Sequence, residues 1–321
     1  MNLVEENNAL SRNEGKVAIV GAGRVGSSAA YAMMLDGVAS HVTLIDINAQ
    51  KAEGEALDLA HGMQFTRSTK IEGGDSFELV SDAVVVVVCA GVAQKAGEKR
   101  TDLLKKNCEV FDQIIPQIVK YNKDAILLII TNPVDVLTYR AWKLSGFDSC
   151  RVFSSGTVLD TARLRYLLGE YFSVSPKDIV AYVLGEHGDS EFVWWSKATI
   201  GGIALNKFKK YSFFVLNEIY EKVKNAAYYV IEKKGATNYA IGLVIAKIVR
   251  AILLDQSRVF TVSNVLQDYK GVSEVALSIP TIIRRAGICQ RLDIELNKEE
   301  LDKFHASAQK IAGLIKVASK Y

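Results

Sequence analysis

Three side chains that could together move a proton and a hydride on a small acid lie close together in the chain. Asp160 and Arg163 are three residues apart, and His187 follows 24 residues after Arg163, within the segment GEHGD at 185–189. A guanidinium binds a carboxylate through two parallel hydrogen bonds. An imidazole exchanges a proton near neutral pH, and a buried carboxylate can fix its tautomer and stabilise the imidazolium. This set suits an α-keto or α-hydroxy acid as substrate.

Each of these residues also has an ordinary structural interpretation. An aspartate and an arginine three residues apart on a helix usually form a surface ion pair. If Asp160 and Arg163 paired only with each other, neither could take part in such chemistry. His187 could likewise be a hydrogen-bonded residue of the core. We favour the chemical interpretation because the set lies downstream of a pattern that is typical of dinucleotide binding.

That pattern begins with an apolar stretch at 16–20, followed by Gly21, Gly23 and Gly26 in the spacing GxGxxG. The first glycine permits a tight turn, the second lets the backbone approach a pyrophosphate, and the third lets helix and strand pack closely. The pyrophosphate would lie at the helix N-terminus. A second strand at 42–46 ends in Asp46, whose carboxylate would bind ribose hydroxyls and repel a 2′-phosphate. The next two residues carry no charge, so the sequence favours NAD over NADP.

Composition excludes several classes of protein. The 39 basic and 36 acidic residues are intermixed, so the net charge of +3 gives no footprint for nucleic acid. The hydrophobic content of 49% supports a large core in 321 residues. The longest apolar segments are too short to cross a bilayer, and residues 1–14 lack the apolar run of a signal peptide. The four cysteines are scattered without CxxC spacing, so we expect free thiols, no metal site and a cytoplasmic location.

The periodicity of apolar residues indicates the elements that must position these side chains. Strands are predicted at 16–20, 42–46, 84–89 and 126–130, and helices at 27–35, 101–121 and 134–144. This alternation predicts a doubly wound parallel sheet, the Rossmann architecture, in an α/β protein. The rest of the chain reads as α+β, with helices at 158–169, 212–234 and 237–254, strands near 259–266 and 275–294, and a terminal helix. We therefore expect a cofactor domain at 1–154 and a substrate domain at 155–321.

Six motifs occur in order along the chain: GAGRVG at 21–26, QKAGEKR at 94–100, TNPVD at 131–135, SGTVLDTAR at 155–163, GEHGD at 185–189 and GAT at 235–237. In this combination the sequence resembles the bacterial L-lactate dehydrogenases of the lactate/malate dehydrogenase family, from about residue 16 to residue 316. The resemblance implies NAD as cofactor, pyruvate and lactate as substrates, and a homo-oligomer, either tetramer or dimer. The alternatives are a malate dehydrogenase and a catalytically idle NAD-binding protein on the same scaffold.

The resemblance also assigns roles to individual residues. His187 corresponds to the general acid and base, Asp160 to the carboxylate that orients it, and Arg163 to the clamp on the substrate carboxylate. Asn132 corresponds to a residue that hydrogen-bonds the substrate oxygen. In the family the peptide bond before the residue matching Pro133 is cis.

Residues 91–100 correspond to a lid that closes over the substrate. Within it, Arg100 matches the arginine that polarises the carbonyl, and Gln94 would face the variable end of the substrate. Thr237 would line the other side of the same pocket, and Ile241 would press on the nicotinamide. Their simpler alternatives are a solvated charge for Arg100, the outer face of a loop for Gln94 and a helix cap for Thr237. Further cofactor contacts implied by the family are Val25, Lys51, Gly91, Asn132 and Ser155.

One departure from the family concerns regulation. Relatives activated by fructose 1,6-bisphosphate place an arginine and a histidine at a subunit interface. Arg165 matches that arginine, but Val180 stands where the histidine belongs. An allosteric role for Arg165 is therefore in doubt. Trp194 and Trp195 form an aromatic pair after the histidine motif, and we expect them to serve in core or interface packing.

Overall fold

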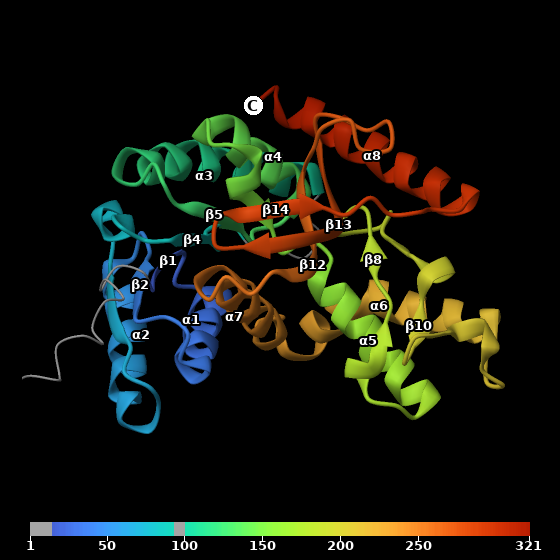
Figure 1. The fold of residues 1–321 in the computed structure, drawn as a ribbon. Helices are drawn as coiled ribbons and strands as arrows, with labels where there is room; N and C mark the ends of the chain where they lie inside the picture. The colour runs from blue at the N-terminus through green and yellow to red at the C-terminus, as the bar shows by residue number, and fades with distance from the viewer. Residues whose placement is uncertain (1–14, 93–99) are drawn as a thin grey trace, which may run out of the picture.

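The computed structural model describes residues 15–92 and 100–321, and its centre is a single nine-stranded sheet (Figure 1). The strand order is β14-β13-β12-β6-β5-β4-β1-β2-β3. The six strands from β6 to β3 pair in parallel in the order of a doubly wound nucleotide-binding sheet. The remaining three extend the β6 edge in antiparallel fashion. The strands are β1 (Lys16–Val20), β2 (His41–Ile45), β3 (Lys70–Gly74), β4 (Val85–Val88), β5 (Ile126–Ile129), β6 (Val152–Ser154), β12 (Arg258–Leu266), β13 (Val275–Arg284) and β14 (Gly287–Arg291).

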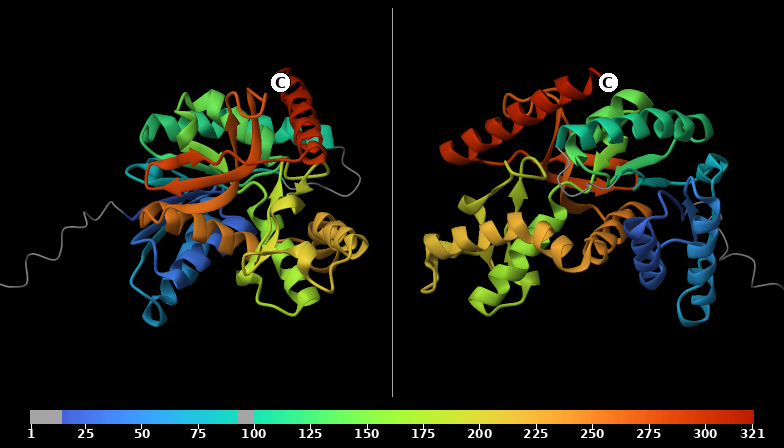
Figure 2. Two further views of the ribbon diagram at one scale, coloured as in Figure 1. Left: turned by 45° about the vertical axis from the view of Figure 1, so that its right-hand side comes forward. Right: turned by 180° about the vertical axis from the view of Figure 1, so that it is seen from behind.

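Helices cover both faces of this sheet. Figures 1 and 2 show α3 (Arg100–Tyr121), α4 (Val134–Ser145) and α8 (Lys298–Ala318) on one face. On the other face lie α1 (Arg24–Asp36), α2 (Ala49–His61) and α7 (Tyr239–Leu253). The four valines of β4 are fully buried, and successive ones point to opposite faces. Burial on both faces explains why this strand is a continuous apolar run.

The second half of the chain adds a smaller layer beside the sheet. In Figure 1, α5 (Val158–Phe172), α6 (Phe213–Lys234) and β10 (Thr199–Ile200) lie together away from α1 and α2. A separate hydrophobic cluster joins α5, α6 and the short strands. Those strands are β7 (Ile179–Val180), β8 (Val183–Leu184), β9 (Phe192–Val193) and β10. The exposed strand β11 (Ile203–Ala204) pairs with β10. Short 3-10 helices connect the elements at Met63–Phe65, Phe77–Val80, Ser149–Arg151, Pro176–Asp178, Trp195–Lys197 and Leu205–Lys207.

The doubly wound sheet and the α+β second half are confirmed, with local differences from the sequence prediction. The predicted strand at 275–294 is two strands, because the chain turns between β13 and β14, where Gly287 has φ +97°. Helix α1 begins at Arg24, three residues earlier than expected. The sequence analysis did not predict α2, β3 or the short strands.

Other expectations concern cysteines, membrane segments and the tryptophan pair. All four cysteines are free thiols. Among the described residues, no helix is long and apolar enough to span a membrane. Trp194 packs against one core cluster and donates its indole N–H to the Glu295 carbonyl, and Trp195 packs against the cluster around α5. Core packing thus accounts for the pair within this chain.

Candidate active site

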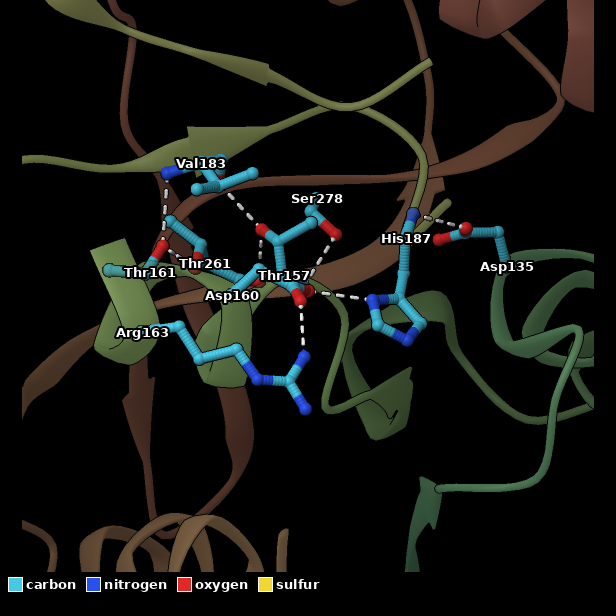
Figure 3. Close-up of polar contacts among 9 residues, drawn as sticks. All are labelled: Asp135, Thr157, Asp160, Thr161, Arg163, Val183, His187, Thr261 and Ser278. Atoms are coloured by element: carbon cyan, nitrogen blue, oxygen red, sulfur yellow. Dashed lines mark hydrogen bonds and ion pairs between the residues drawn. The ribbon is translucent and has the colours of Figure 1, made fainter. Parts of the chain in front are cut away.

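Hydrogen bonds of two threonine hydroxyls, one donating and one accepting, hold the helix that carries Asp160 against the strand that leads to His187. The Thr157 hydroxyl donates to the Val183 carbonyl, and the Val183 N–H donates to the Thr161 hydroxyl. Both threonines belong to the start of α5, and Val183 begins β8 (Figure 3). Because α5 and β8 are held together at two points, the aspartate and the histidine are in contact although they are 27 positions apart in the chain.

One buried carboxylate connects the three predicted catalytic side chains. Asp160 Oδ2 lies 2.6 Å from His187 Nδ1, and Asp160 Oδ1 accepts a 2.9 Å hydrogen bond from Arg163 Nη1 (Figure 3). The Asp160 side chain is 3% exposed, whereas those of Arg163 and His187 are 16% and 26% exposed. The carboxylate is therefore the buried anchor, and the two cationic groups reach outward from it.

This arrangement shifts the protonation of the histidine. Burial by itself disfavours the imidazolium, but the adjacent Asp160 carboxylate more than offsets this and raises the pKa of His187 to about 9. Burial would also raise the pKa of Asp160, yet the His187 and Arg163 charges keep that pKa below its ordinary value. His187 therefore carries a proton at neutral pH and can donate it.

The structural alternative was that Asp160 and Arg163 pair only with each other. The ion pair is present, but it is not isolated. The two residues do form an i,i+3 pair, but the other carboxylate oxygen contacts His187. Figure 3 shows the second terminal nitrogen of Arg163 pointing away from Asp160, on the same side as the second ring nitrogen of His187. Within the part of the chain that the structure describes, that guanidinium nitrogen makes no hydrogen bond. It remains available for a ligand.

The predicted substrate asparagine lies at the end of β5, in a turn braced from two sides. The peptide bond between Asn132 and Pro133 is cis, as the resemblance implied. The Asn132 carbonyl accepts a 2.7 Å hydrogen bond from the buried Asn107 amide, which also accepts the Val92 N–H at 2.7 Å. Asp135, 2% exposed in the first turn of α4, accepts the His187 backbone N–H at 2.8 Å. The asparagine turn and the histidine loop are thus linked.

The glycine fingerprint has the shape that a dinucleotide requires. A Cβ on Gly26 would lie 2.0 Å from the Gly21 carbonyl oxygen, so only glycine lets α1 approach β1 this closely. A Cβ on Gly23 would meet nothing within 4 Å, so the space beside the backbone is open. No side chain caps α1 at Gly23, which leaves its first N–H groups free for an anion. The residues present therefore fit NAD.

A pocket of about 690 Å³ runs from this turn along the carboxyl ends of the strands. Asp46 lies in its wall, with one carboxylate oxygen accepting the Ala22 N–H at 2.8 Å. The predicted cofactor residues that line the pocket are Gly21, Gly23, Asp46, Lys51 and Gly91. Those outside its lining are Val25, Gly26, Asn132, Ser155 and Ile241. Gly26 acts through packing, and the buried Ser155 backbone N–H donates to β5.

The lid residues are only partly described. Gln94 lies outside the described residues, and Arg100 is the first residue of α3. Thr237 is half-buried just before α7, whose N-cap is Asn238. The helix-cap alternative for Thr237 is therefore wrong.

Comparison with known proteins decides the family. Residues 15–154 match the model of the lactate/malate dehydrogenase NAD binding domain, and residues 157–320 match that of the alpha/beta C-terminal domain. The chain belongs to the lactate/malate dehydrogenase family. Its N-terminal half is accordingly an NAD-binding domain, consistent with the glycine turn and the pocket.

Individual relatives in this family are similar over nearly their whole length. An L-lactate dehydrogenase of Clostridium botulinum is 46% identical over 313 residues, covering 96% of this chain and 98% of the relative. One from Acetivibrio thermocellus is 48% identical over 306 residues, covering 94% and 96%. The solved minor L-lactate dehydrogenase of Enterococcus mundtii has a TM-score of 0.92 at 39% identity, covering 95% of this chain and 98% of that one. A lactate dehydrogenase from a deep-sea metagenome library has the same TM-score at 40% identity, covering 95% and 99%.

Three residues of this family member were not assigned roles from the sequence. Asp135 and Asn107 hold backbone groups of the site, and Glu191 lies beside His187 and Asp160. Asp135 lies within the TNPVD motif, so its closeness to Asn132 was the available signal. For Asn107 and Glu191 no spacing in the sequence indicated a contact with residues so distant along the chain.

Proposed function

We propose that this chain is an NAD-dependent L-lactate dehydrogenase, which interconverts pyruvate and NADH with (S)-lactate and NAD⁺. The observation that carries the proposal is the Asp160-centred group, with His187 on one carboxylate oxygen and Arg163 on the other. The names of relatives that are 46% and 48% identical over almost the full chain support the same reaction. We favour NAD over NADP because Asp46 lies in the wall of the dinucleotide pocket.

The proposed roles follow from the chemistry of each side chain. Bound NADH supplies the hydride. His187 donates its proton to the carbonyl oxygen of pyruvate, and Asp160 stabilises the imidazolium before that transfer. Arg163 binds the substrate carboxylate through the nitrogen that points away from Asp160, with a second N–H from the same planar fork.

Other roles rest on the family resemblance and are part of the proposal. Asn132 hydrogen-bonds the substrate oxygen, and Arg100 polarises the carbonyl as negative charge develops. Residues 91–100 act as a lid that excludes water, with Gln94 and Thr237 on either side of the substrate's variable end. In this division of labour, residues 1–154 bind the cofactor and 155–321 bind the substrate.

Two alternatives have weaker support. Malate dehydrogenase requires a cation for the second carboxylate of oxaloacetate, and Gln94 is neutral. An idle NAD-binding protein would have no need for His187 and Arg163 to share one buried carboxylate, an arrangement that is costly to desolvate.

We also propose that the enzyme is a homo-oligomer, either a tetramer or a dimer, with no nucleic acid or membrane partner. Large apolar side chains are exposed on α2 and α7, among them Leu57, Tyr239 and Leu243. Such surfaces are typical of subunit contacts. A cytoplasmic location and a place at the fermentative end of glycolysis complete the proposal.

The direct test is NADH oxidation, followed at 340 nm, with a panel of 2-oxo acids. Pyruvate should be the preferred substrate, and the product should be the (S) enantiomer of lactate. His187→Ala is the companion variant, expected to bind NADH but to lose roughly 10²–10⁴-fold in turnover with the general acid. Turnover of none of the 2-oxo acids would contradict the proposal.

A further inference from the structure

Glu191 is a buried acid next to the catalytic group that the proposed mechanism does not use. One titratable atom from each of Asp160, His187 and Glu191 lies within 4.8 Å of those of the other two. Glu191 is only 6% exposed, and its Oε1 is buried without a hydrogen-bond partner among the described residues. A buried ionised carboxylate requires such partners. The protonation state of Glu191 is therefore set by the neighbouring groups of the site and not by solvent.

Charged and titratable groups reach Glu191 from each element around it. Asp160 and Arg163 of α5 act on it, together with His187 of its own loop and Lys224 of α6. Tyr220 of α6 donates its hydroxyl to the Glu191 backbone carbonyl. On the outer side, a pocket of about 460 Å³ is lined by Glu191 and by further charged residues: Asp189, Glu221, Glu299, Glu300 and Lys303.

The charges of the neighbouring side chains and of the substrate affect when Glu191 is protonated. With His187 protonated, Asp160, His187 and Arg163 together carry a net charge of +1, not counting Lys224 of α6 or the proposed lid arginine Arg100. A substrate carboxylate brings this sum to zero. An ionised Glu191 would then lie near two carboxylates, those of Asp160 and of the substrate, so a bound substrate disfavours its charged form even against the attraction of Lys224.

We propose that Glu191 is protonated when the substrate carboxylate is bound, so that above neutral pH substrate binding is coupled to proton uptake at this side chain. This inference rests on the proposed function, because it takes Arg163 as the site of a carboxylate ligand. Glu191 can exchange its proton with solvent even when substrate fills the other side of the site, because Glu191 also lines the outer pocket.

The titration behaviour of the carboxyl agrees with this geometry. Burial, followed by the negative charge of Asp160, raises the pKa of Glu191 to about 9, although His187 and Lys224 act in the opposite direction. At neutral pH both Glu191 and His187 therefore carry protons before the ligand binds. Near pH 9 each is partly deprotonated, and a carboxylate ligand draws both protons back.

The test is a proton count on ligand binding, which does not depend on turnover. Oxamate, an isostere of pyruvate, is titrated into the enzyme–NADH complex by calorimetry in buffers of different ionisation enthalpy, from about pH 7 to about pH 10. We expect the wild-type protein to take up more than one proton per oxamate near pH 9.5. Glu191→Gln, which mimics the neutral acid, should take up at most one, the proton of His187.

The pH dependence of oxamate affinity gives an independent readout. On the alkaline side, wild-type affinity should fall by up to about 100-fold per pH unit, the limit for two linked protons, and by about 10-fold in Glu191→Gln. Glu300→Gln is the matched control, because Glu300 is a buried acid of the same pocket whose carboxylate binds Ser196. Glu300→Gln should take up the same number of protons per bound oxamate as the wild type.

Uptake that never exceeds one proton in the wild type would overturn the inference, even if Glu191→Gln failed to fold. Equal counts in the wild type and Glu191→Gln would overturn it as well. A complete lack of oxamate binding would instead contradict the proposed function, and this inference with it.

Discussion

At the scale of residues, the site depends on one carboxylate that serves two cations. Asp160 uses one oxygen for His187 and the other for Arg163. The cost of burying its charge is offset by two charge-assisted hydrogen bonds. The same contacts orient the imidazole and keep the guanidinium close to it. In the proposed mechanism, acid catalysis and substrate binding are therefore coupled through a single side chain.

The planar fork of Arg163 should matter beyond its charge. In Arg163→Lys, an ammonium cannot bind Asp160 and also offer two parallel hydrogen bonds to the substrate. A lost charge-assisted hydrogen bond is worth about 1.5–3 kcal/mol, so kcat/KM for pyruvate should fall by roughly 10- to 150-fold. Steady-state kinetics measure this, with NADH affinity as the control for folding. Unchanged kcat and KM would place the clamp elsewhere.

The raised pKa of His187 sets a pH limit on pyruvate reduction. The imidazolium is needed as the acid, so kcat/KM should be level below the pKa and fall as pH rises through about 9. Asp160→Asn removes the charge that raises this pKa, and the fall should move to lower pH, towards the ordinary histidine value of about 6.5. Full pH profiles of both proteins provide the measurement. An alkaline limb at the same pH in both would show that the Asp160 charge does not raise the pKa of His187.

Residue types and spacing were sufficient to predict that Asp160, Arg163 and His187 act as one group, and the structure does bring them together, but its supporting contacts could not be predicted. Asp160, Arg163 and His187 have side chains whose chemistry is specific in combination. Asn107 and Asp135 instead act on backbone groups, and these contacts depend on how α3 and α4 are placed. No local pattern in the sequence encodes that placement.

At the scale of elements, helix α3 connects the segment at Val92 to the turn that contains Asn132. Its first residue is Arg100, the proposed lid arginine, and its buried Asn107 binds both Val92 and Asn132. One side chain thus links the chain before the proposed lid, the helix after it and the turn of Asn132.

Asn107→Ala should therefore affect both stability and substrate binding. It leaves the Val92 N–H and the Asn132 carbonyl without this partner, at a cost of about 1–3 kcal/mol. We expect a lower Tm and a raised KM for pyruvate. Asn122→Ala is the matched control, because this buried residue just after α3 also donates to two carbonyls but far from the substrate turn. If both variants changed only Tm, the link to the lid would be rejected.

Elements with strong hydrophobic patterns were predictable, and weakly patterned ones were not. The run of four buried valines was sufficient to predict β4, and the apolar stripe was sufficient to predict α8. Helix α2 buries only Ala52 and Ala56, and β3 contains two glycines and no fully buried residue. These two elements form because β2 and the rest of the sheet offer a place to pack, which is tertiary information.

At the scale of the whole molecule, the arginine expected at an effector site is engaged within its own chain. Arg165 donates its Nε–H to the Ala181 carbonyl, and its guanidinium lies 4.8 Å from the centre of the Tyr182 ring. Val180, 43% exposed on β7, offers no side-chain donor to a phosphate. An anion site there would have fewer partners to offset phosphate desolvation.

Fructose 1,6-bisphosphate should accordingly activate this enzyme weakly or not at all. Pyruvate saturation curves with and without millimolar bisphosphate measure the effect. A decrease in KM of about tenfold, worth about 1.4 kcal/mol of coupling, would mean that the site works without the histidine.

The choice of substrate distinguishes this enzyme from a malate dehydrogenase, and Gln94 is the residue proposed to decide it. A second carboxylate enclosed without a cation costs on the order of 2–5 kcal/mol. The wild type should therefore prefer pyruvate over oxaloacetate by at least roughly 30-fold in kcat/KM. Gln94→Arg should invert the preference, because the guanidinium attracts oxaloacetate and is left unpaired with pyruvate.

Steady-state measurement of kcat/KM for both keto acids on both proteins decides the question. We expect a ratio that favours pyruvate in the wild type and oxaloacetate in Gln94→Arg. A ratio that changes by less than about threefold, under 1 kcal/mol, would contradict the role of Gln94 and remove the main support for lactate dehydrogenase over malate dehydrogenase.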